Sequence, residues 1–243
     1  MKALKFELKG KSAFYKKTDV HKNVFFTYSH IHKVALLGLL GSIIGLDGYS
    51  KQYETKQKHP EFYEKLKNLK ISIVPKSEND GYFDKKIITF NNAIGLASNE
   101  EGGILNIKEQ WLINVCWDIY ILDDNSEEYL QLKKYLLTKK SKYIPYLGKN
   151  DHFADITNVQ EIILTIPMEI KYIHSLCMDN VEVELNSFSY NFNEPVRYFE
   201  YLPYELDKNN LYKFKLFTFT NLELKAEKYN DIYTDQDKNL MFF

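Results

Sequence analysis

The sequence predicts an α+β fold, with one mixed domain followed by a β-rich C-terminal region. Residues 3–9 and 111–121 alternate apolar and polar side chains, which is the period of a half-buried strand. Residues 33–47 form an apolar run without that alternation, which favours a helix. With 243 residues, 44% of them hydrophobic, the chain can bury a sizeable core without staples.

The first strand, 3–9, is expected to end at Gly10, and a basic loop follows it to about Lys33. The helix over 33–47 carries glycines along one stripe, and each costs about 1 kcal/mol of helix propensity. These glycines are Gly38, Gly41 and Gly45. We expect close packing of this stripe onto a sheet as the compensation.

A polar helical stretch over 50–69, broken near Pro60, precedes a short strand over 70–74. The runs 85–95 and 103–110 flank a polar, turn-rich tip. This spacing predicts a long hairpin that projects from the body.

The strand over 111–121 is the most regular of the chain, and Trp111 and Trp117 fall on the same face of it. We expect that face to point into the core. Its other members are Ile113, Val115, Ile119 and Ile121. Residues 123–126 supply helix-capping side chains, and the helix over 127–140 begins with acids and ends with lysines.

A loop or edge segment over 143–156 leads to a last strand over 159–166. The resulting order of elements is that of a ferredoxin-like (RRM-like) domain over 1–167, with a hairpin insertion at about 85–110. Aromatic residues and short β-prone runs dominate 168–243. We expect this part to be a small β-rich region that covers the first domain.

Charge is unevenly distributed, although the formal net charge is −1. Residues 1–33 hold eight lysines against two acids, and 126–150 hold six lysines against two acids. Such asymmetry creates a local field that attracts a polyanion. The alternative is a lysine-rich composition spread over solvated surfaces. The acidic stretch 179–207 is expected to face a partner protein or solvent, because like charge repels phosphate.

No targeting segment, membrane span, cofactor or metal site is expected. Cys116 and Cys177 lie far apart and form no CxxC motif, which favours a reduced, cytoplasmic chain. The longest uncharged apolar run, 34–46, is shorter than the ~20 residues of a spanning helix, so it predicts a buried helix.

Three segments, in this order and spacing, carry a resemblance. They are the first strand ending in Gly10 and followed by Ala-Phe-Tyr at 13–15, the Leu- and Gly-rich helix over 36–46, and Tyr-Leu-Gly-Lys at 146–149. Together they resemble the fifth family of CRISPR-associated (Cas) proteins, the RAMP-type subunits of type I Cascade complexes. The nearest subtype is I-B, and the resemblance covers about residues 1–160.

The resemblance implies a ferredoxin-like fold with a projecting hairpin thumb. It also implies a non-catalytic, RNA-binding subunit that caps the complex, holds the 5′ handle of CRISPR RNA and supports antiviral defence. The implied partners are CRISPR RNA, the backbone subunit and the large subunit, with target DNA reached indirectly through the complex. In subtype I-C, the family itself cuts the precursor RNA. Tyr15 stands where the family often has arginine, and residues 28–33 lack its prolines and threonines.

Single-stranded RNA is held by lysines at phosphates and by aromatic or polar side chains at bases. The basic loop and the hairpin both supply such residues. The candidate RNA contacts are Lys9, Lys11, Tyr15, Lys16, Lys17, Lys22, Asn91, Asn92, Lys108 and Lys149. The alternatives are a solvated loop with Phe14 in the core, and plain turn chemistry for the two asparagines.

The histidines at 21, 30 and 32 admit three hypotheses. They are polar loop residues, a metal site, or part of a metal-independent endoribonuclease that processes precursor RNA. In the last case His30 or His32 would be the general acid or base and Lys33 would stabilise the phosphate. We favour no catalytic residue. A third functional class, an unrelated RNA-binding ferredoxin-like module, also fits the predicted fold.

Overall fold

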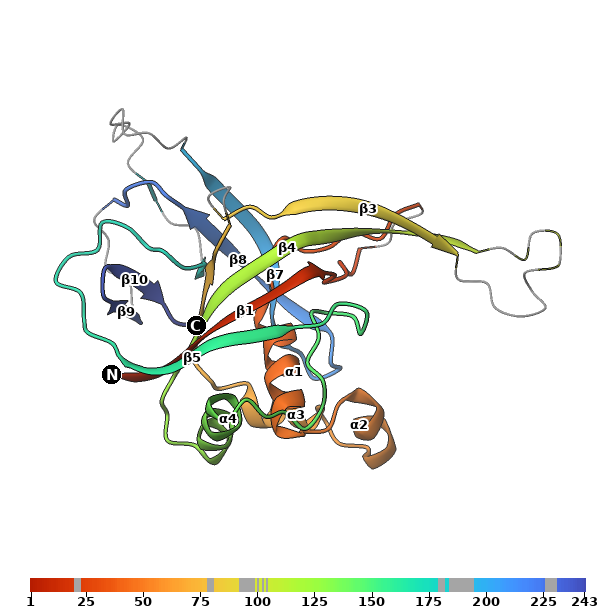
Figure 1. The fold of residues 1–243 in the computed structure, drawn as a ribbon, viewed down its shortest axis with the longest axis horizontal. Coiled ribbons are helices and arrows are strands. Elements are labelled where there is room, and N and C mark those ends of the chain that lie inside the picture. The colour runs from red at the N-terminus through yellow and green to blue at the C-terminus, as the bar shows by residue number, and fades with distance from the viewer. Residues whose placement is uncertain are drawn as a thin grey trace.

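The computed structural model shows an antiparallel sheet with helices on one face and smaller C-terminal sheets beside it (Figure 1). This confirms the α+β class. The residues that the structure describes are 1–19, 23–77, 81–91, 99, 101, 103, 105–178, 182–183, 195–225 and 231–243.

The main sheet has the strand order β2-β4-β1-β5, and every neighbouring pair in it is antiparallel. Its strands are β1 (Lys2–Ala13), β2 (Ile71–Pro75), β4 (Asn106–Leu122) and β5 (Asp155–Ile163). One helical segment follows β1 and another follows β4, so the order of elements is compatible with the ferredoxin-like arrangement. Strand β5 begins and ends earlier than the predicted 159–166.

Four helices are α1 (Lys33–Ile44), α2 (Tyr49–Thr55), α3 (Glu61–Leu66) and α4 (Glu127–Leu137). Pro60 is the N-cap of α3, which confirms the predicted break. Among the described residues, no single helix is long and apolar enough to span a bilayer, and only α1 and α2 together, bent by 80°, reach that length and composition.

Gly10 does not end the first strand, so that prediction is wrong. Strand β1 continues through it to Ala13. A Cβ at Gly10 would lie 2.5 Å from Leu147 Cδ1 and 2.9 Å from the Phe153 carbonyl oxygen. The glycine therefore lets the segment before β5 approach the strand closely.

The glycine stripe of α1 packs on another helix rather than on a sheet, which corrects our expectation. A Cβ at Gly41 would lie 2.5 Å from Phe62 Cβ, and one at Gly38 would lie 3.7 Å from the Phe62 ring. Gly45 is the left-handed C-cap of α1, with φ 86°, so it ends the helix. Close contact between α1 and α3 thus offsets the weak propensity of the run.

The core face of β4 changes at Asn114, which has φ 51°. Before it, Leu112 is fully buried and Ile113 is not, whereas Trp117 beyond it is fully buried. The predicted core positions of Ile113 and Trp111 are therefore wrong, because the left-handed residue breaks the alternation. Trp111 is only partly buried.

The predicted projecting hairpin is present (Figure 1). Strand β3 (Asp84–Asn91) pairs with the first half of β4, from Asp84 opposite Ile113 to Asn91 opposite Asn106. The remainder of the predicted first arm, 92–95, lies outside the described residues.

The C-terminal strands complete the main core. The strands are β6 (Cys177–Met178), β7 (Arg197–Leu206), β8 (Tyr212–Thr220), β9 (Ile232–Asp235) and β10 (Lys238–Met241). Leu202 and Phe217 join the core formed by the main sheet and α1, α3 and α4. Phe243 exchanges two backbone hydrogen bonds with Ile71, so the chain end extends the edge at β2.

Candidate nucleic-acid interface

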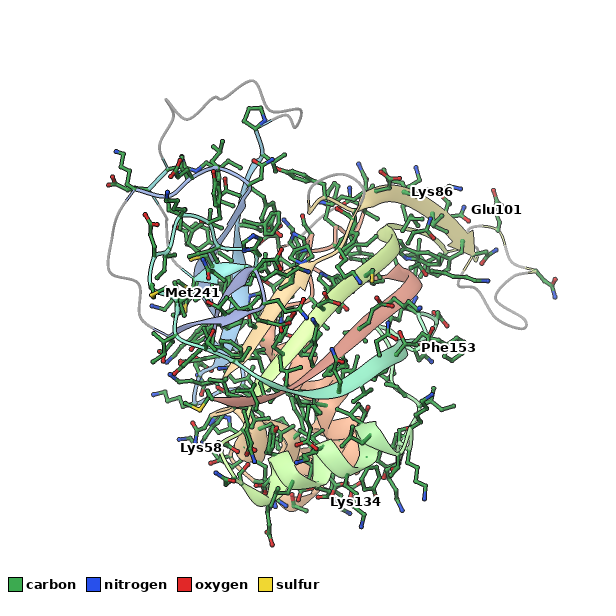
Figure 2. All side chains as sticks on the ribbon, turned by 60° about the vertical axis from the view of Figure 1, so that its left-hand side comes forward. Lys58, Lys86, Glu101, Lys134, Phe153 and Met241 are labelled. Atoms are coloured by element: carbon green, nitrogen blue, oxygen red, sulfur yellow. The ribbon has the colours of Figure 1, made fainter. Side chains whose placement is uncertain are left out.

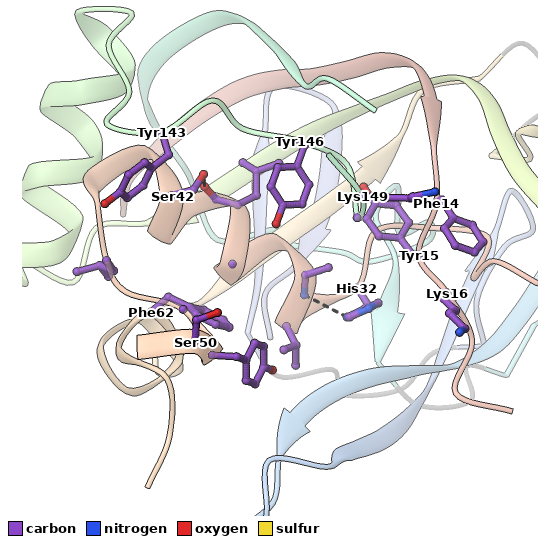
Figure 3. Close-up of a pocket in the computed structure, with 18 of the residues that line it drawn as sticks. Phe14, Tyr15, Lys16, His32, Ser42, Ser50, Phe62, Tyr143, Tyr146 and Lys149 are labelled. Atoms are coloured by element: carbon purple, nitrogen blue, oxygen red, sulfur yellow. Dashed lines mark hydrogen bonds between the residues drawn. The ribbon is translucent and has the colours of Figure 1, made fainter. Parts of the chain in front are cut away.

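A groove of about 960 Å³ lies along α1, and we call it the α1 groove. Besides α1, its walls come mainly from residues 14–16, 46–51 and 143–149. Figure 3 shows Tyr143 near one end, Phe14 and Lys16 near the other, and Tyr146 between them. The groove therefore brings together all three segments of the resemblance, which are far apart in sequence.

The groove wall over 143–149 is fixed at its C-terminal end, around Gly148, to the segment that contains Phe14. The Phe14 amide donates to the Leu147 carbonyl over 3.1 Å. Gly148 has φ 87°, and a Cβ there would collide with the Phe14 carbonyl oxygen. Only a glycine allows this approach, because it lacks a Cβ and tolerates positive φ.

The N-terminal end of the same wall is fixed to the last turn of α1. The Lys142 amide donates to the Ile43 carbonyl over 2.8 Å, and the Tyr143 amide donates to the Ser42 carbonyl over 3.1 Å. These bonds satisfy carbonyls that have no partner within the helix. The groove is therefore a built feature with both ends held by backbone hydrogen bonds.

Three tyrosines give the groove exposed aromatic surface. The exposed fractions are 46% for Tyr49, 53% for Tyr143 and 47% for Tyr146. Sequence reasoning missed all three. The signal was present, since Tyr143 and Tyr146 lie between Lys142 and Lys149, a mixture of lysines and aromatics like the one that singled out the basic loop.

The basic loop lies beside the outer paired part of the hairpin, where Lys108 is opposite Thr89. The amide of Phe25 donates to the Lys108 carbonyl over 2.9 Å. The Lys16 Nζ atom lies 3.9 Å from the centre of the Phe25 ring. Lys16 and Lys108 are both exposed, so two predicted contacts meet near one end of the groove.

Lys149 lies in the groove wall and shares its charge with acids. Its Nζ atom is 3.4 Å from Glu109 and 3.3 Å from Asp151. The same Nζ lies 4.9 Å from the centre of the Phe90 ring of the hairpin. Trp111 also donates to Glu109 over 2.8 Å. Lys149 thus links the groove wall to the outer paired part of the hairpin.

Lys17 points into a polar cluster rather than toward solvent. Its Nζ atom lies 2.5 Å from Glu200 Oε1, and Glu200 also accepts from the Ser29 amide and the Tyr198 hydroxyl. Burial alone would raise the pKa of Glu200, but these hydrogen bonds outweigh it and hold the pKa below its ordinary value. This acid therefore faces neither a partner nor solvent, which corrects the expectation for this part of the acidic stretch.

Lys9 lies on the face of β1 opposite to Leu8, away from the main core. It pairs with Glu7 at 3.3 Å and with Asp155 at 3.9 Å. Glu7 also accepts from Lys76 over 2.7 Å, and this bond is the main cause that lowers its pKa to about 2. Ion pairs connect the charged side chains on this part of the sheet face, and we call them the ion-pair ladder. The charge of Lys9 is therefore already neutralised.

The ring of Tyr15 is only 3% exposed. It packs edge-on against His32 and Trp117, with ring centroids 6.1 and 6.3 Å apart. This placement does not support a ring stacked under a base. Phe14 is also buried, as the alternative to RNA contact expected.

Of the remaining candidate RNA contacts, two lie in the described part of the chain and two do not. Lys11 and Asn91 are exposed, on β1 and at the end of β3. Lys22 and Asn92 lie outside the described residues, as does His21.

The fallback histidines are core residues. His30 is 1% exposed and accepts from Trp117 Nε1 over 3.4 Å, while His32 is 4% exposed and caps α1 by accepting from the Ala35 amide over 3.2 Å. Burial lowers the pKa of each to about 3, so both are neutral at pH 7.

Lys33, the third fallback residue, is also buried. Its Nζ atom lies 4.8 Å from the centre of the Tyr204 ring, and burial lowers its pKa to about 8. The geometry assigns all three to packing and helix capping. Within the described residues, no group of three or more histidine, cysteine or acidic side chains is placed to hold a metal ion.

No protein-family model matches the chain, and no curated protein matches it. Solved structures do. A chain of a "CRISPR RNA-guided surveillance complex" superposes with a TM-score of 0.51 at 11% identity, over 91% of this chain and 90% of that one. A CRISPR protein from Archaeoglobus fulgidus superposes with a TM-score of 0.53 at 11% identity, over 99% and 98%. Over nearly its whole length, this chain therefore has the fold of CRISPR-associated proteins.

Proposed function

We propose that this protein is an RNA-binding subunit of a CRISPR RNA-guided complex and that the α1 groove holds a single-stranded segment of the CRISPR RNA. The observation that carries the proposal is the groove itself, which lines up exposed tyrosines along its length and has the exposed Lys16 at one end. The fold shared with a chain of an RNA-guided surveillance complex supports the same assignment.

The chemistry of the groove suits an unpaired strand. Tyr143 and Tyr146 offer ring surface to bases, which stack on aromatic side chains irrespective of sequence. Lys16 supplies positive charge for phosphates at one end, and Lys108 extends that charge onto the hairpin. A paired duplex would hide the base faces that the tyrosines need.

The resemblance narrows the proposal further. It assigns the bound segment to the 5′ handle and the complex to a type I Cascade, nearest to subtype I-B. In that role the protein caps one end of the complex and contacts the backbone and large subunits. The hairpin formed by β3 and β4 projects from the body, as such a contact requires (Figure 1).

We propose a binding role without catalysis. His30 and His32 are neutral and buried, so neither presents a titrating nitrogen to a 2′-hydroxyl. Incubation of the full chain with repeat RNA in EDTA tests this proposal. We expect uncut RNA. A single cut that disappears in an H30A/H32A variant whose thermal midpoint is unchanged would establish the endoribonuclease instead.

The binding proposal is tested with two double variants. Y143A/Y146A removes groove tyrosines, and F199A/Y201A removes two rings of β7 that are more exposed and lie outside the groove. Each stacked base is worth roughly 1–3 kcal/mol, so we expect the first variant to lose about tenfold or more in affinity for single-stranded RNA. Equal affinities of the two variants would contradict the proposal.

A further inference from the structure

Four lysines at the end of α4 form a positive surface outside the groove. They are Lys134, Lys139, Lys140 and Lys142, and we call them the α4 lysine patch. All four are exposed, and none forms an ion pair with any residue in the described part of the chain. Their neighbour Lys133, in contrast, pairs with Glu161 at 2.6 Å.

Helix stability does not account for the patch. Cations near a helix C-terminus favour the helix dipole, but α4 ends at Leu137, so only Lys134 lies within it. Lys139 has φ 52°, a conformation that glycine or asparagine usually supplies at this place. Its amide and that of Lys140 donate back to α4, so the turn that carries these charges is fixed.

The patch begins where the α1 groove ends. Lys142 lies against Gly45, the residue that closes α1, since a Cβ on Gly45 would lie 2.8 Å from Lys142 Cγ. The next residues, Tyr143 and Ile144, line the groove. A strand that leaves the groove past Tyr143 therefore meets Lys142 first.

The charge of the patch is not balanced along the chain. No acid occurs between Glu128 and Asp151. Figure 2 shows Lys134 at the outer edge of the molecule, on α4 and away from the labelled Lys86 of the hairpin. Four unpaired cations on one short segment repel one another, and a polyanion relieves that repulsion.

We propose that a single-stranded nucleic acid held in the α1 groove continues over the α4 lysine patch, with its phosphates on these lysines. The inference rests on the proposed function of the groove and adds a second contact surface to it. A single strand is the occupant because the patch is continuous with Tyr143 and Ile144, whose wall suits unpaired bases. The phosphate path then runs from Lys16, along α1, to the end of α4.

The test compares two variants of equal charge change in the full chain. The patch variant combines K134Q, K139Q, K140Q and K142Q. The control combines K2Q, K58Q, K208Q and K215Q, which are exposed lysines without an ion pair in the described residues and outside the groove. The affinity for oligo(U) is measured at a series of salt concentrations, with one RNA of about 20 nucleotides and one of about four. The longer RNA exceeds the typical site size of a single-strand-binding groove, which is roughly 4–16 nucleotides.

For the long oligo(U), we expect the slope of log affinity against log salt to fall by about 0.7 for each phosphate contact that the patch variant loses. For the short one, we expect the patch variant and the control to agree. Equal slopes of the two variants on the long RNA overturn the inference. The inference is also overturned if an RNA duplex of the same length binds in a way that requires the patch lysines but is unaffected by Y143A/Y146A.

The two proposals fail in different ways. If the unaltered protein binds no single-stranded RNA, or binds it equally well without the groove tyrosines, the proposed function fails. If binding depends on those tyrosines but not on the patch, the function stands and only the extended path is wrong.

Discussion

Lys17 Nζ lies 2.5 Å from Glu200 Oε1, and this contact ties the basic loop after β1 to strand β7. Both side chains are largely buried, at 28% and 13% exposure. The Ser29 amide adds a second bond from the same loop to the carboxylate, over 2.9 Å. The C-terminal region therefore helps to position the loop that forms one end of the groove.

Removing the Glu200 carboxylate is expected to destabilise the protein. Glu200→Ala leaves Lys17 charged and without its partner, and breaking a buried pair costs about 3–5 kcal/mol. Glu200→Gln is the matched control, since it keeps acceptors for the Ser29 amide and the Tyr198 hydroxyl. Chemical denaturation of the three proteins measures the difference. A Glu200→Gln variant as stable as the unaltered protein would mean that the charge of Glu200 is irrelevant to stability.

Lys16 and Lys17 are expected to have different roles, although they are neighbours in sequence. Lys16 is exposed beside Phe25, so Lys16→Gln should weaken single-stranded RNA binding and lower the salt slope by about 0.7. Lys17→Gln should lower the midpoint of thermal unfolding instead, because it breaks the contact with Glu200. Each variant is the control for the other, and identical profiles would contradict the assignment.

The sequence was sufficient for the elements with strong local patterns. Alternation identified β1 and the second half of β4, and capping residues identified the start of α4, where Ser126 accepts from the Tyr129 amide. It failed where tertiary contact decides the outcome. Nothing local in Gly10 tells a strand end from a place of close approach, and nothing local in Asn114 announces a left-handed residue inside a strand.

The candidate site was predictable only in part for the same reason. Composition pointed to Lys16 as basic and exposed, but the partner of Lys17 comes from β7, far along the chain. Tyr15 looked like a stacking residue because it lies among lysines, yet its ring fills the core beside Trp117. Tyr146 entered the sequence analysis only through the resemblance, and Tyr143 did not enter it, because the stretch over 143–156 was expected to be a loop or edge segment.

The ion-pair ladder on the sheet predicts a pH dependence through Glu7. Its pKa is lowered from 4.5 to about 2, mainly by the hydrogen bond from Lys76. A depressed carboxyl pKa contributes stability that is fully present above the unfolded value and is lost as pH falls through the folded value. The stability difference between the protein and Glu7→Gln should therefore shrink as pH falls from about 4.5 toward about 2. Thermal unfolding at a series of pH values measures it, and a difference independent of pH would contradict the pairing.

Gly148 and Gly48 both line the α1 groove. We expect an added methyl group to disturb the protein at Gly148 and to have no effect at Gly48. Gly148→Ala places a Cβ against the Phe14 carbonyl oxygen in a left-handed backbone, which costs of order 1–3 kcal/mol. A Cβ on Gly48 meets nothing within 4 Å. We therefore expect Gly148→Ala to lose both stability and affinity for single-stranded RNA, because the wall over 143–149 separates from Phe14.

Gly48→Ala is the control and should keep its thermal midpoint and its affinity. The thermal midpoint and the affinity for single-stranded RNA are measured for both variants. If Gly148→Ala binds RNA as tightly as the unaltered protein while it is destabilised, then the close approach of this wall to Phe14 serves the fold alone. If the two properties fall together, the glycine that shapes the wall also shapes the surface that the RNA contacts.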